Sequence, residues 1–269
     1  MDLNLRNRVA LVTGAGRGIG AAIALNLGNE GVNVAVNDID GPAAKKVATN
    51  ILGAGSMAIE ADVTKQDQVG KMMDQVLSEF GRLDILVNNA GVVYGAAGPI
   101  IRKPFRESSF DEWSKEIDLI LNGTMHCTKS AVEYMIKQKY GRIINISSDV
   151  AKAPLGLKGI GIYSMAKAGL NALTRSLATE FAPHGITVNV VSAGMVRTTR
   201  ALLAELERKQ KPTEYEYFRD LENKVLKLIP LNRMGEPDDV AKLVVFLASD
   251  ASSWITGQTF SVNGGLVML

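Results

Sequence analysis

Two side chains with acid–base chemistry, Tyr163 and Lys167, stand four residues apart in the chain. On a helix, residues at this spacing share one face. An ammonium group beside a phenol favours the phenolate, so it lowers the pKa of a tyrosine from its ordinary value of about 10. A phenol shifted in this way can act as a general acid or base on a hydroxyl group. Ser148 follows an apolar run and could hydrogen-bond a substrate oxygen as charge develops there.

The spacing alone is weak evidence, because short motifs arise by chance and a surface pair on a helix is the alternative interpretation. The other motifs along the chain raise its value. A glycine-rich turn, Thr13-Gly14-Ala15-Gly16-Arg17-Gly18-Ile19-Gly20, follows the apolar run 9–12 and opens a helical pattern that extends to about Glu30. Glycines let a pyrophosphate approach the backbone, and the free N–H groups of the helix face it. A plain turn is the alternative, but this position favours dinucleotide binding, with contacts from Gly14, Arg17, Gly18 and Ile19.

The choice of dinucleotide depends on Asp38, which ends the second apolar run, eighteen residues after Gly20. A carboxylate there can accept hydrogen bonds from the adenine ribose and repel the 2′-phosphate of NADP. A helix cap is the alternative role for such an aspartate. Arg17 argues the other way, because a guanidinium could hold a 2′-phosphate. We give Asp38 more weight, and the cofactor expected is NAD.

Adjacent asparagines follow the fourth apolar run, in the sequence Asn88-Asn89-Ala90-Gly91. Their amide groups could tie strand ends together or touch a ligand, and an Asn-Gly type of turn is the alternative. We include Asn89, Ala90 and Gly91 among the expected cofactor contacts.

Seven short apolar runs alternate with helical patterns and supply the elements that must position these residues. The runs cover residues 9–12, 32–36, 57–59, 83–87, 142–146, 186–191 and 259–262. Most are apolar on both faces, as in parallel strands buried between two helix layers. The pattern predicts a single α/β domain over residues 1–269, a three-layer, doubly wound, Rossmann-type fold. Such folds bind ligands at the carboxyl ends of their strands, where the residues above stand.

The composition is that of a soluble globular protein, with 46% hydrophobic and 22% charged residues. Because 30 Lys and Arg balance 28 Asp and Glu, nothing favours nucleic acid or an anionic membrane as a partner. No apolar run is long enough to cross a bilayer, and the single cysteine, Cys127, fits a reducing compartment, so we expect a cytoplasmic protein. His126 and His184 have no companions at ligand spacing, so no metal site is expected.

Taken together, the chain resembles the short-chain dehydrogenase/reductase family over essentially its whole length. The motifs that carry the resemblance are 13–20, 62–63, 88–91, 145–148, 163–167 and 189–198. The family implies a seven-stranded parallel sheet and a homotetramer or homodimer. It implies that Lys167 bonds the nicotinamide ribose and that Tyr163 transfers the proton. It places Val196 and Thr198 at the carboxamide, and Asp62 and Val63 at the adenine.

The chain departs from the family pattern in four places. Ala193-Gly194 replaces a Pro-Gly pair, the interval from Ser148 to Tyr163 is two residues longer than usual, and the segment between Gly91 and Trp113 is also longer. Where the family carries an asparagine whose main chain and a water connect the catalytic lysine to solvent, this chain has Ile120. Either Asn122 replaces the missing asparagine through a shifted helix turn, or the main chain and a water are enough to connect the lysine to solvent. We favour the second and leave Asn122 out of the catalytic set.

The substrate expected is a secondary alcohol or ketone, either small and cyclic or linked to coenzyme A. A substrate lid is expected at about 198–228, a stretch rich in charge for which a solvated helix face is the simpler interpretation. The basic residues that could instead receive a phosphate-bearing carrier include Arg102, Lys103, Arg106, Lys152 and Lys158. The run 145–151 and the ending 264–268 look somewhat like dehydrogenases of alicyclic acyl-coenzyme A esters. A fatty-acid-type 3-oxoacyl reductase is the other common family member, but it usually takes NADPH.

Two other classes stay open. A catalytically silent NAD-binding scaffold or regulatory subunit of the same fold would explain Ile120, although Ser148, Tyr163 and Lys167 argue against it. A glycine-loop methyltransferase also binds an adenosine cofactor on an α/β sheet, but it would not need the tyrosine–lysine pair.

Overall fold

A seven-stranded parallel sheet forms the centre of the computed structural model, which describes residues 2–91, 94–95, 98–99, 103–153, 155–197, 216, 220, 223–224 and 226–268. The strand order is β3-β2-β1-β4-β7-β8-β9. These strands are β1 (Val9–Val12), β2 (Asn33–Asp38), β3 (Ser56–Glu60), β4 (Ile85–Asn88), β7 (Gly141–Ser148), β8 (Ile186–Ala193) and β9 (Thr259–Val262). The seven strands and the parallel sheet expected from the sequence are thus confirmed.

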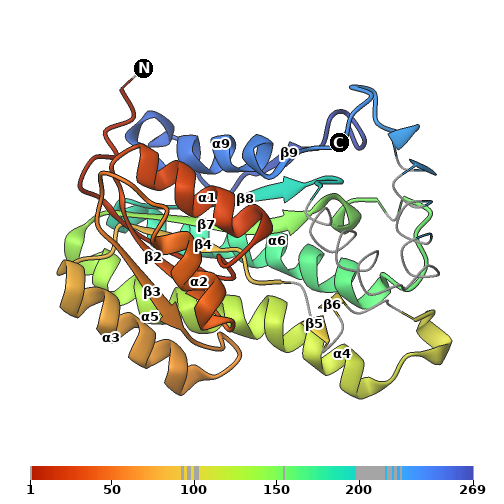
Figure 1. The fold of residues 1–269 in the computed structure, drawn as a ribbon, viewed down its shortest axis with the longest axis horizontal. Coiled ribbons are helices and arrows are strands. Elements are labelled where there is room, and N and C mark those ends of the chain that lie inside the picture. The colour runs from red at the N-terminus through yellow and green to blue at the C-terminus, as the bar shows by residue number, and fades with distance from the viewer. Residues whose placement is uncertain are drawn as a thin grey trace.

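Helices cover both faces of the sheet and complete three layers (Figure 1). One layer contains α1 (Gly18–Asn29), α2 (Gly41–Ala48) and α9 (Pro237–Ala248), which enclose one apolar core with the sheet. The other contains α3 (Gln66–Phe80), α5 (Gly123–Gln138) and α6 (Gly161–Phe181), which enclose a second core. The buried Val, Ile and Leu side chains of the strands divide between these cores, which explains why the strand sequences are apolar on both faces.

Local signals in the sequence set several helix ends. Ser109 and Glu112 form a reciprocal capping box at the start of α4 (Phe110–Ile117), and Pro237 stands at the first turn of α9. Gly81 ends α3 with a φ of 73°, in the left-handed region that glycine adopts at low cost. Capping and turn chemistry therefore agree with the hydrophobic pattern in these elements.

The direction in which the chain adds strands to the sheet reverses between β1 and β4. From β1 the chain builds outward to β2 and β3, and it then returns to place β4, β7, β8 and β9 on the other side. A crevice at the carboxyl ends of the strands is expected at such a switch point. Thr13, Asp38, Asn88 and Ser148 all lie at or just beyond these ends.

The opposite end of the sheet contains a partly buried network of charged and aromatic side chains. The ring of Tyr140 lies between two guanidinium groups, with Arg8 at 3.8 Å and Arg142 at 4.3 Å from its centroid. Its hydroxyl donates to Asp250, which also pairs with Arg142 at 3.2 Å. Burial raises the pKa of Tyr140 to about 12, so this phenol stays protonated. Polar groups at this end are thus joined to one another by a hydrogen bond, an ion pair and two cation–π contacts.

Two features of the structure go beyond the sequence pattern. Strands β7 and β8 each run two residues past the expected run, to Ser148 and Ala193. A short antiparallel hairpin, β5 (Tyr94–Gly95) with β6 (Gly98–Pro99), lies in the long segment before α4 and was not expected. Most of the expected lid at 198–228 lies outside the described residues. Among the described helices, none is long and apolar enough to span a membrane.

Candidate active site

Tyr163 and Lys167 lie on the first turns of α6, as their spacing predicts. Lys167 is only 3% exposed, and its Nζ donates a hydrogen bond of 2.6 Å to the main-chain oxygen of Ile146 in β7. The same Nζ lies 5.8 Å from the centroid of the half-buried Tyr163 ring. Ser148 is half-buried at the last position of β7. The structure thus places the ammonium group beside the phenol and next to the strand that carries the serine.

Side-chain hydrogen bonds hold α6 against β7 along its length. The Oγ of Ser147 donates to the main-chain oxygen of Lys167 at 3.2 Å, and the Oγ of Ser164 donates to that of Val150. Deeper in the core, the amide of Asn145 donates to Thr174 at 2.9 Å. Since each bond joins a residue near the serine to one near the tyrosine–lysine pair, the two halves of the site keep a fixed distance.

The glycine-rich turn is joined to the end of β4 by Asn89. The Asn89 side-chain amide donates to the main-chain oxygens of Thr13 and Gly14, each at 2.9 Å. In return, Thr13 Oγ1 accepts from the main-chain N–H groups of Asn89 and Ala90. Of the two sequence interpretations, the amide tie between strand ends is therefore confirmed for Asn89.

The same turn leaves space and free donors for phosphates. Gly14 has a φ of 60°, and a Cβ there would lie 2.9 Å from the Cα of Ala90, so no larger residue fits. At the N-terminus of α1, the cap residue Arg17 makes no side-chain capping bond and the first turn has no acidic residue. A twelve-residue helix with uncapped N–H groups and no negative charge suits an anion. These features fit the pyrophosphate of a dinucleotide.

Asp38 is buried at the end of β2, and its carboxylate lies at the rim of the glycine-rich turn. One oxygen accepts from the N–H of Gly16 at 2.8 Å and the other from the N–H of Asp40 at 3.0 Å. Asp40 in turn forms an ion pair with Arg17. The prediction weighed Arg17 only against Asp38, but the local sequence Asp38-Ile39-Asp40 contains a second acidic residue that pairs with Arg17. Two carboxylates thus stand where a single one was expected, and Arg17 is already paired.

Asp62 and Val63 follow β3, on the α5 side. The Asp62 carboxylate accepts from the N–H of Thr64, which orders this turn. The main-chain oxygen of Val63 lies 3.1 Å from Nδ1 of His126. The Val63 side chain packs against Gly123 in α5. His126 therefore has a structural contact at this turn. Gly91 lies beside the tyrosine–lysine pair, since a Cβ there would stand 2.8 Å from Nζ of Lys167.

Ile120 lies within a π-helical turn, Asp118–Asn122, between α4 and α5. The N–H of Gly123 bonds to the main-chain oxygen of Asp118, five residues back, and the Ile120 side chain is buried. The local bend therefore exists without a polar side chain at position 120. The Asn122 amide donates to Asp118 Oδ1 at 2.7 Å in an exposed contact. This arrangement agrees with leaving Asn122 out of the catalytic set.

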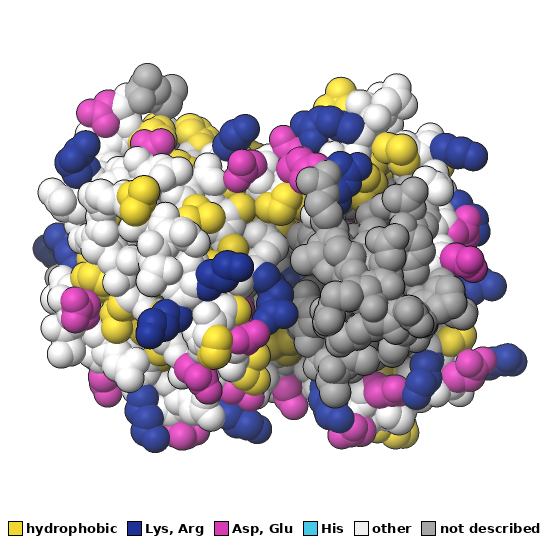
Figure 2. All heavy atoms as spheres, in the orientation of Figure 1, with side chains coloured by type: hydrophobic (Ala, Val, Ile, Leu, Met, Phe, Trp, Pro, Cys, Tyr) yellow, Lys and Arg dark blue, Asp and Glu magenta, His cyan; other side chains and the backbone are white. Residues whose placement is uncertain are grey.

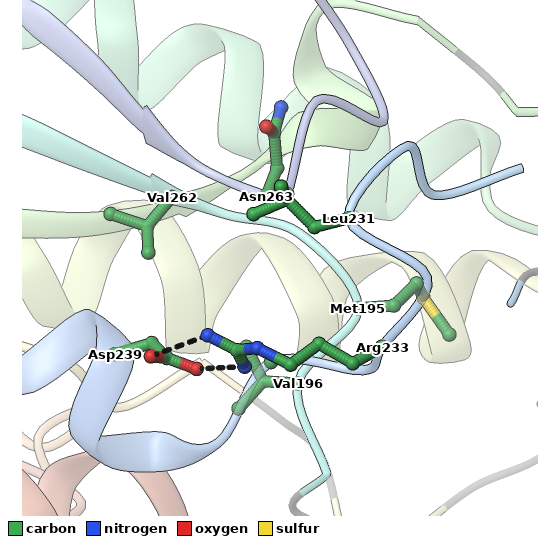
Figure 3. Close-up of a pocket in the computed structure, with 9 residues that line it drawn as sticks. Met195, Val196, Leu231, Arg233, Asp239, Val262 and Asn263 are labelled. Atoms are coloured by element: carbon green, nitrogen blue, oxygen red, sulfur yellow. Dashed lines mark hydrogen bonds and ion pairs between the residues drawn. The ribbon is translucent and has the colours of Figure 1, made fainter.

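A cavity of about 170 Å³ opens beside the end of β8 (Figure 3). Its lining includes Met195, Val196 and Leu231, with Val262 and Asn263 from the end of β9. Arg233 and Asp239 line another side of it and form an ion pair through both carboxylate oxygens, drawn as dashed lines in Figure 3. Val196, an expected carboxamide contact, pairs with Gly235 through a parallel bridge at this edge. Thr198 lies outside the described residues.

Three of the four described basic residues that could receive a phosphate-bearing carrier have other partners. Lys103 pairs with Glu112, Arg106 with Glu107, and Lys152 donates to Ser261 at 2.7 Å. Lys158 is exposed, and Arg102 lies outside the described residues. On the face in Figure 2, positive and negative side chains are interspersed. Within the described ranges, no group of three or more His, Cys, Asp or Glu could hold a metal ion.

The comparisons with known proteins agree with this geometry. A family model described as Enoyl-(Acyl carrier protein) reductase matches residues 14–267. A 3-oxoacyl-[acyl-carrier-protein] reductase FabG of Staphylococcus epidermidis is 41% identical, over 97% of this chain and 100% of its own. A 3-oxoacyl-[acyl-carrier-protein] reductase of Synechocystis sp. is 40% identical, over 98% of both chains. A short-chain type dehydrogenase/reductase from Mycobacterium marinum has a similar structure, with a TM-score of 0.84 and 32% identity over 99% of this chain and 98% of that one.

The chain therefore belongs to the short-chain dehydrogenase/reductase family. It is an oxidoreductase of that family with a Rossmann-type fold, and the family binds a nicotinamide dinucleotide.

Proposed function

We propose that the protein is an NAD-dependent oxidoreductase that interconverts a secondary alcohol and a ketone, with Ser148, Tyr163 and Lys167 as its catalytic residues. The observation that carries the proposal is the buried Lys167 ammonium, which hydrogen-bonds to β7 beside the Tyr163 ring at the end of the strand that bears Ser148. A methyltransferase has no use for this arrangement.

Each residue has a defined task in the reaction. The nicotinamide, when bound, accepts or supplies the hydride. Tyr163 gives its proton to the ketone oxygen or takes it from the alcohol. The Lys167 ammonium favours the phenolate of Tyr163 and would bond the nicotinamide ribose of the bound cofactor. Ser148 donates a hydrogen bond to the substrate oxygen, where negative charge develops as the ketone is reduced.

We propose NAD as the cofactor because of the charges at the rim of the glycine-rich turn. Asp38 and Asp40 would both repel a 2′-phosphate, and the guanidinium of Arg17, which lies at the same rim, is paired with Asp40. The Asp38 oxygens retain lone pairs that could accept from ribose hydroxyls. The remaining expected cofactor contacts are Gly14, Gly18, Ile19, Asp62, Val63, Asn89, Ala90, Gly91, Tyr163, Lys167, Val196 and Thr198.

For the substrate, we propose an acyl thioester or a small cyclic alcohol. The names of the relatives support the acyl-linked choice, since both curated relatives act on 3-oxoacyl groups of an acyl-carrier protein. The described basic residues give a coenzyme A site little support, because Lys103, Arg106 and Lys152 have other partners. We therefore propose that the protein recognises the acyl chain and the thioester of its substrate, and we propose no site for the phosphates of coenzyme A.

We further propose a cytoplasmic homotetramer or homodimer. Strand β9 is an edge strand of the sheet, and none of its four residues is charged. Trp254, just before β9, is 99% exposed. An uncharged sheet edge beside an exposed indole suits an interface between copies of this chain. The single buried cysteine fits a reducing compartment.

The test is a steady-state assay with acetoacetyl-coenzyme A, and with cyclic ketones, using NADH and NADPH in parallel. We expect kcat/KM to be at least about tenfold higher with NADH, a difference of about 1.4 kcal/mol. We expect Tyr163→Phe to lower kcat by about 10²- to 10⁴-fold with little change in NADH binding, because it removes the hydroxyl that carries the transferable proton and keeps the ring. Equal efficiency with NADPH would refute the cofactor assignment. A wild-type protein that binds NADH but reduces none of these ketones would favour the silent scaffold.

A further inference from the structure

Asp149 is a buried carboxylate next to the catalytic serine, and the reaction described above gives it no task. It follows Ser148 directly and is only 1% exposed. Its Oδ1 accepts from the Ser192 hydroxyl in β8 at 2.9 Å, and its Oδ2 accepts from the Asn263 side-chain amide. No lysine or arginine in the described part of the chain pairs with it. Burying a carboxylate with neutral donors is costly, so these donors must hold it in place.

Asn263 extends this contact into the C-terminal loop. Its amide nitrogen also donates to the main-chain oxygen of Val267 at 2.7 Å, and its Oδ1 accepts from the N–H of Gly265 at 2.9 Å. Both polar atoms of this side chain are therefore bonded. Asn263 also lines the cavity in Figure 3, beside Leu231 and Val262. Asp149 thus joins the serine-bearing strand end to one wall of that cavity.

Gly194 shows how closely these segments approach one another. A Cβ at Gly194 would stand 2.6 Å from the Cβ of Asn263 and 3.5 Å from Oδ2 of Asp149. Its N–H also bonds to the main-chain oxygen of Val262 at 3.0 Å. The glycine after β8 is therefore required by the close approach of Asn263, and Asp149 lies at ordinary contact distance from the same position.

We propose that Asp149 is a positioning residue for Ser148, and that through Asn263 it holds the serine and the C-terminal cavity wall in one fixed arrangement. This inference rests on the proposed function above. The main chain of Asp149 is fixed as well, since its oxygen accepts from the N–H groups of Lys152 and Ala153 at 2.9 and 3.0 Å. With both its side chain and its main chain fixed, Asp149 determines where the preceding residue presents its hydroxyl. A small displacement of that hydroxyl weakens its bond to the substrate oxygen in the transition state.

Kinetics of Asp149→Ala and Asp149→Asn with acetoacetyl-coenzyme A and NADH test the positioning role. The alanine variant loses both bonds, so we expect kcat to fall by about 10- to 100-fold while the Kd for NADH stays unchanged. We also expect the isotope effect with deuterated NADH to rise, because hydride transfer becomes rate-limiting. The asparagine variant should recover most of kcat, since its oxygen can accept from Asn263 and its amide can donate to Ser192. Asn263→Ala should resemble Asp149→Ala, and the double variant should add little.

Hydrogen–deuterium exchange provides a readout that does not depend on activity. In Asp149→Ala we expect faster exchange both in residues 147–153 and in residues 263–268, and in Asp149→Asn near-normal exchange in both. The proposal is overturned if exchange rises in only one segment. It is also overturned if folded Asp149→Ala keeps kcat within about twofold, or if the asparagine variant loses as much kcat as the alanine variant. If the wild type reduces no ketone, the proposed function fails by itself, and the exchange result still decides whether the two segments are coupled.

Discussion

Lys167 shows how much of this site depends on the close fit of individual residues. Its Nζ bonds to the main-chain oxygen of Ile146. Gly91 leaves room for the same Nζ, because a Cβ there would stand only 2.8 Å from it. An arginine could not replace it, because a planar guanidinium needs more room than a buried ammonium. The short interval from Tyr163 to Lys167 was enough to predict their shared helix face. The carbonyl partner was not predictable, because it comes from a different element.

Cys127 permits a prediction at the same scale. Its thiol is buried in α5, and burial raises its pKa to about 12, so almost no thiolate exists at neutral pH. We expect no reaction of the folded protein with a disulfide reagent such as Ellman's reagent, and one thiol per chain after unfolding in urea. Rapid labelling of the folded protein would show that this part of α5 opens in solution.

At the scale of elements, the turn between β1 and α1 depends on backbone geometry. Gly14 lies at a positive φ against the backbone of Ala90, and the Asn89 amide bonds across the same turn. The glycine spacing identified the turn from the sequence. The asparagine tie was only one of two interpretations, since it joins residues more than seventy positions apart.

Gly14→Ala should be destabilising for this reason. The added methyl would meet the backbone of Ala90 at 2.9 Å, and alanine would be strained at a φ of 60°. We expect a loss of about 1–3 kcal/mol in the free energy of unfolding, together with weaker NADH binding. Chemical denaturation and fluorescence titration measure the two effects.

Gly70→Ala is the matched control. Gly70 lies inside α3 with nothing within 4 Å of an added Cβ, so alanine there should raise the free energy of unfolding by about 0.5–1 kcal/mol. If both alanines changed stability by the same amount, contact with Ala90 would not be the reason for glycine at position 14.

The whole molecule has two different sheet edges. At one edge, β3 has Glu60 and other exposed residues, and the charge of Glu60 discourages pairing with another chain. At the other edge, β9 is uncharged and Trp254 is nearly fully exposed. The proposed oligomer therefore uses the β9 edge.

Trp254→Asp tests this assignment. A carboxylate in a desolvated interface is costly, so we expect the molar mass from light scattering to fall toward that of a smaller assembly, with an unchanged circular dichroism spectrum. Leu52→Asp is the control, because Leu52 is also highly exposed but lies in the segment that leads into β3, at the opposite edge. If the Leu52 variant dissociated and the Trp254 variant did not, the interface would lie at the β3 edge and the assignment to the β9 edge would be refuted.

The sequence by itself determined the seven strands, the glycine-rich turn and the helix face that Tyr163 and Lys167 share. Each of these depends on short-range patterns: apolar runs, glycine spacing and the four-residue period of a helix. Only the tertiary structure showed that Arg17 is paired with Asp40, that the bend at Ile120 persists as a π-turn, and that Asp149 meets Ser192 and Asn263. The last contact joins side chains 43 and 114 positions apart, and the sheet order decides which strand ends become neighbours. No local pattern records such proximity, because it is produced by the packing of the whole domain.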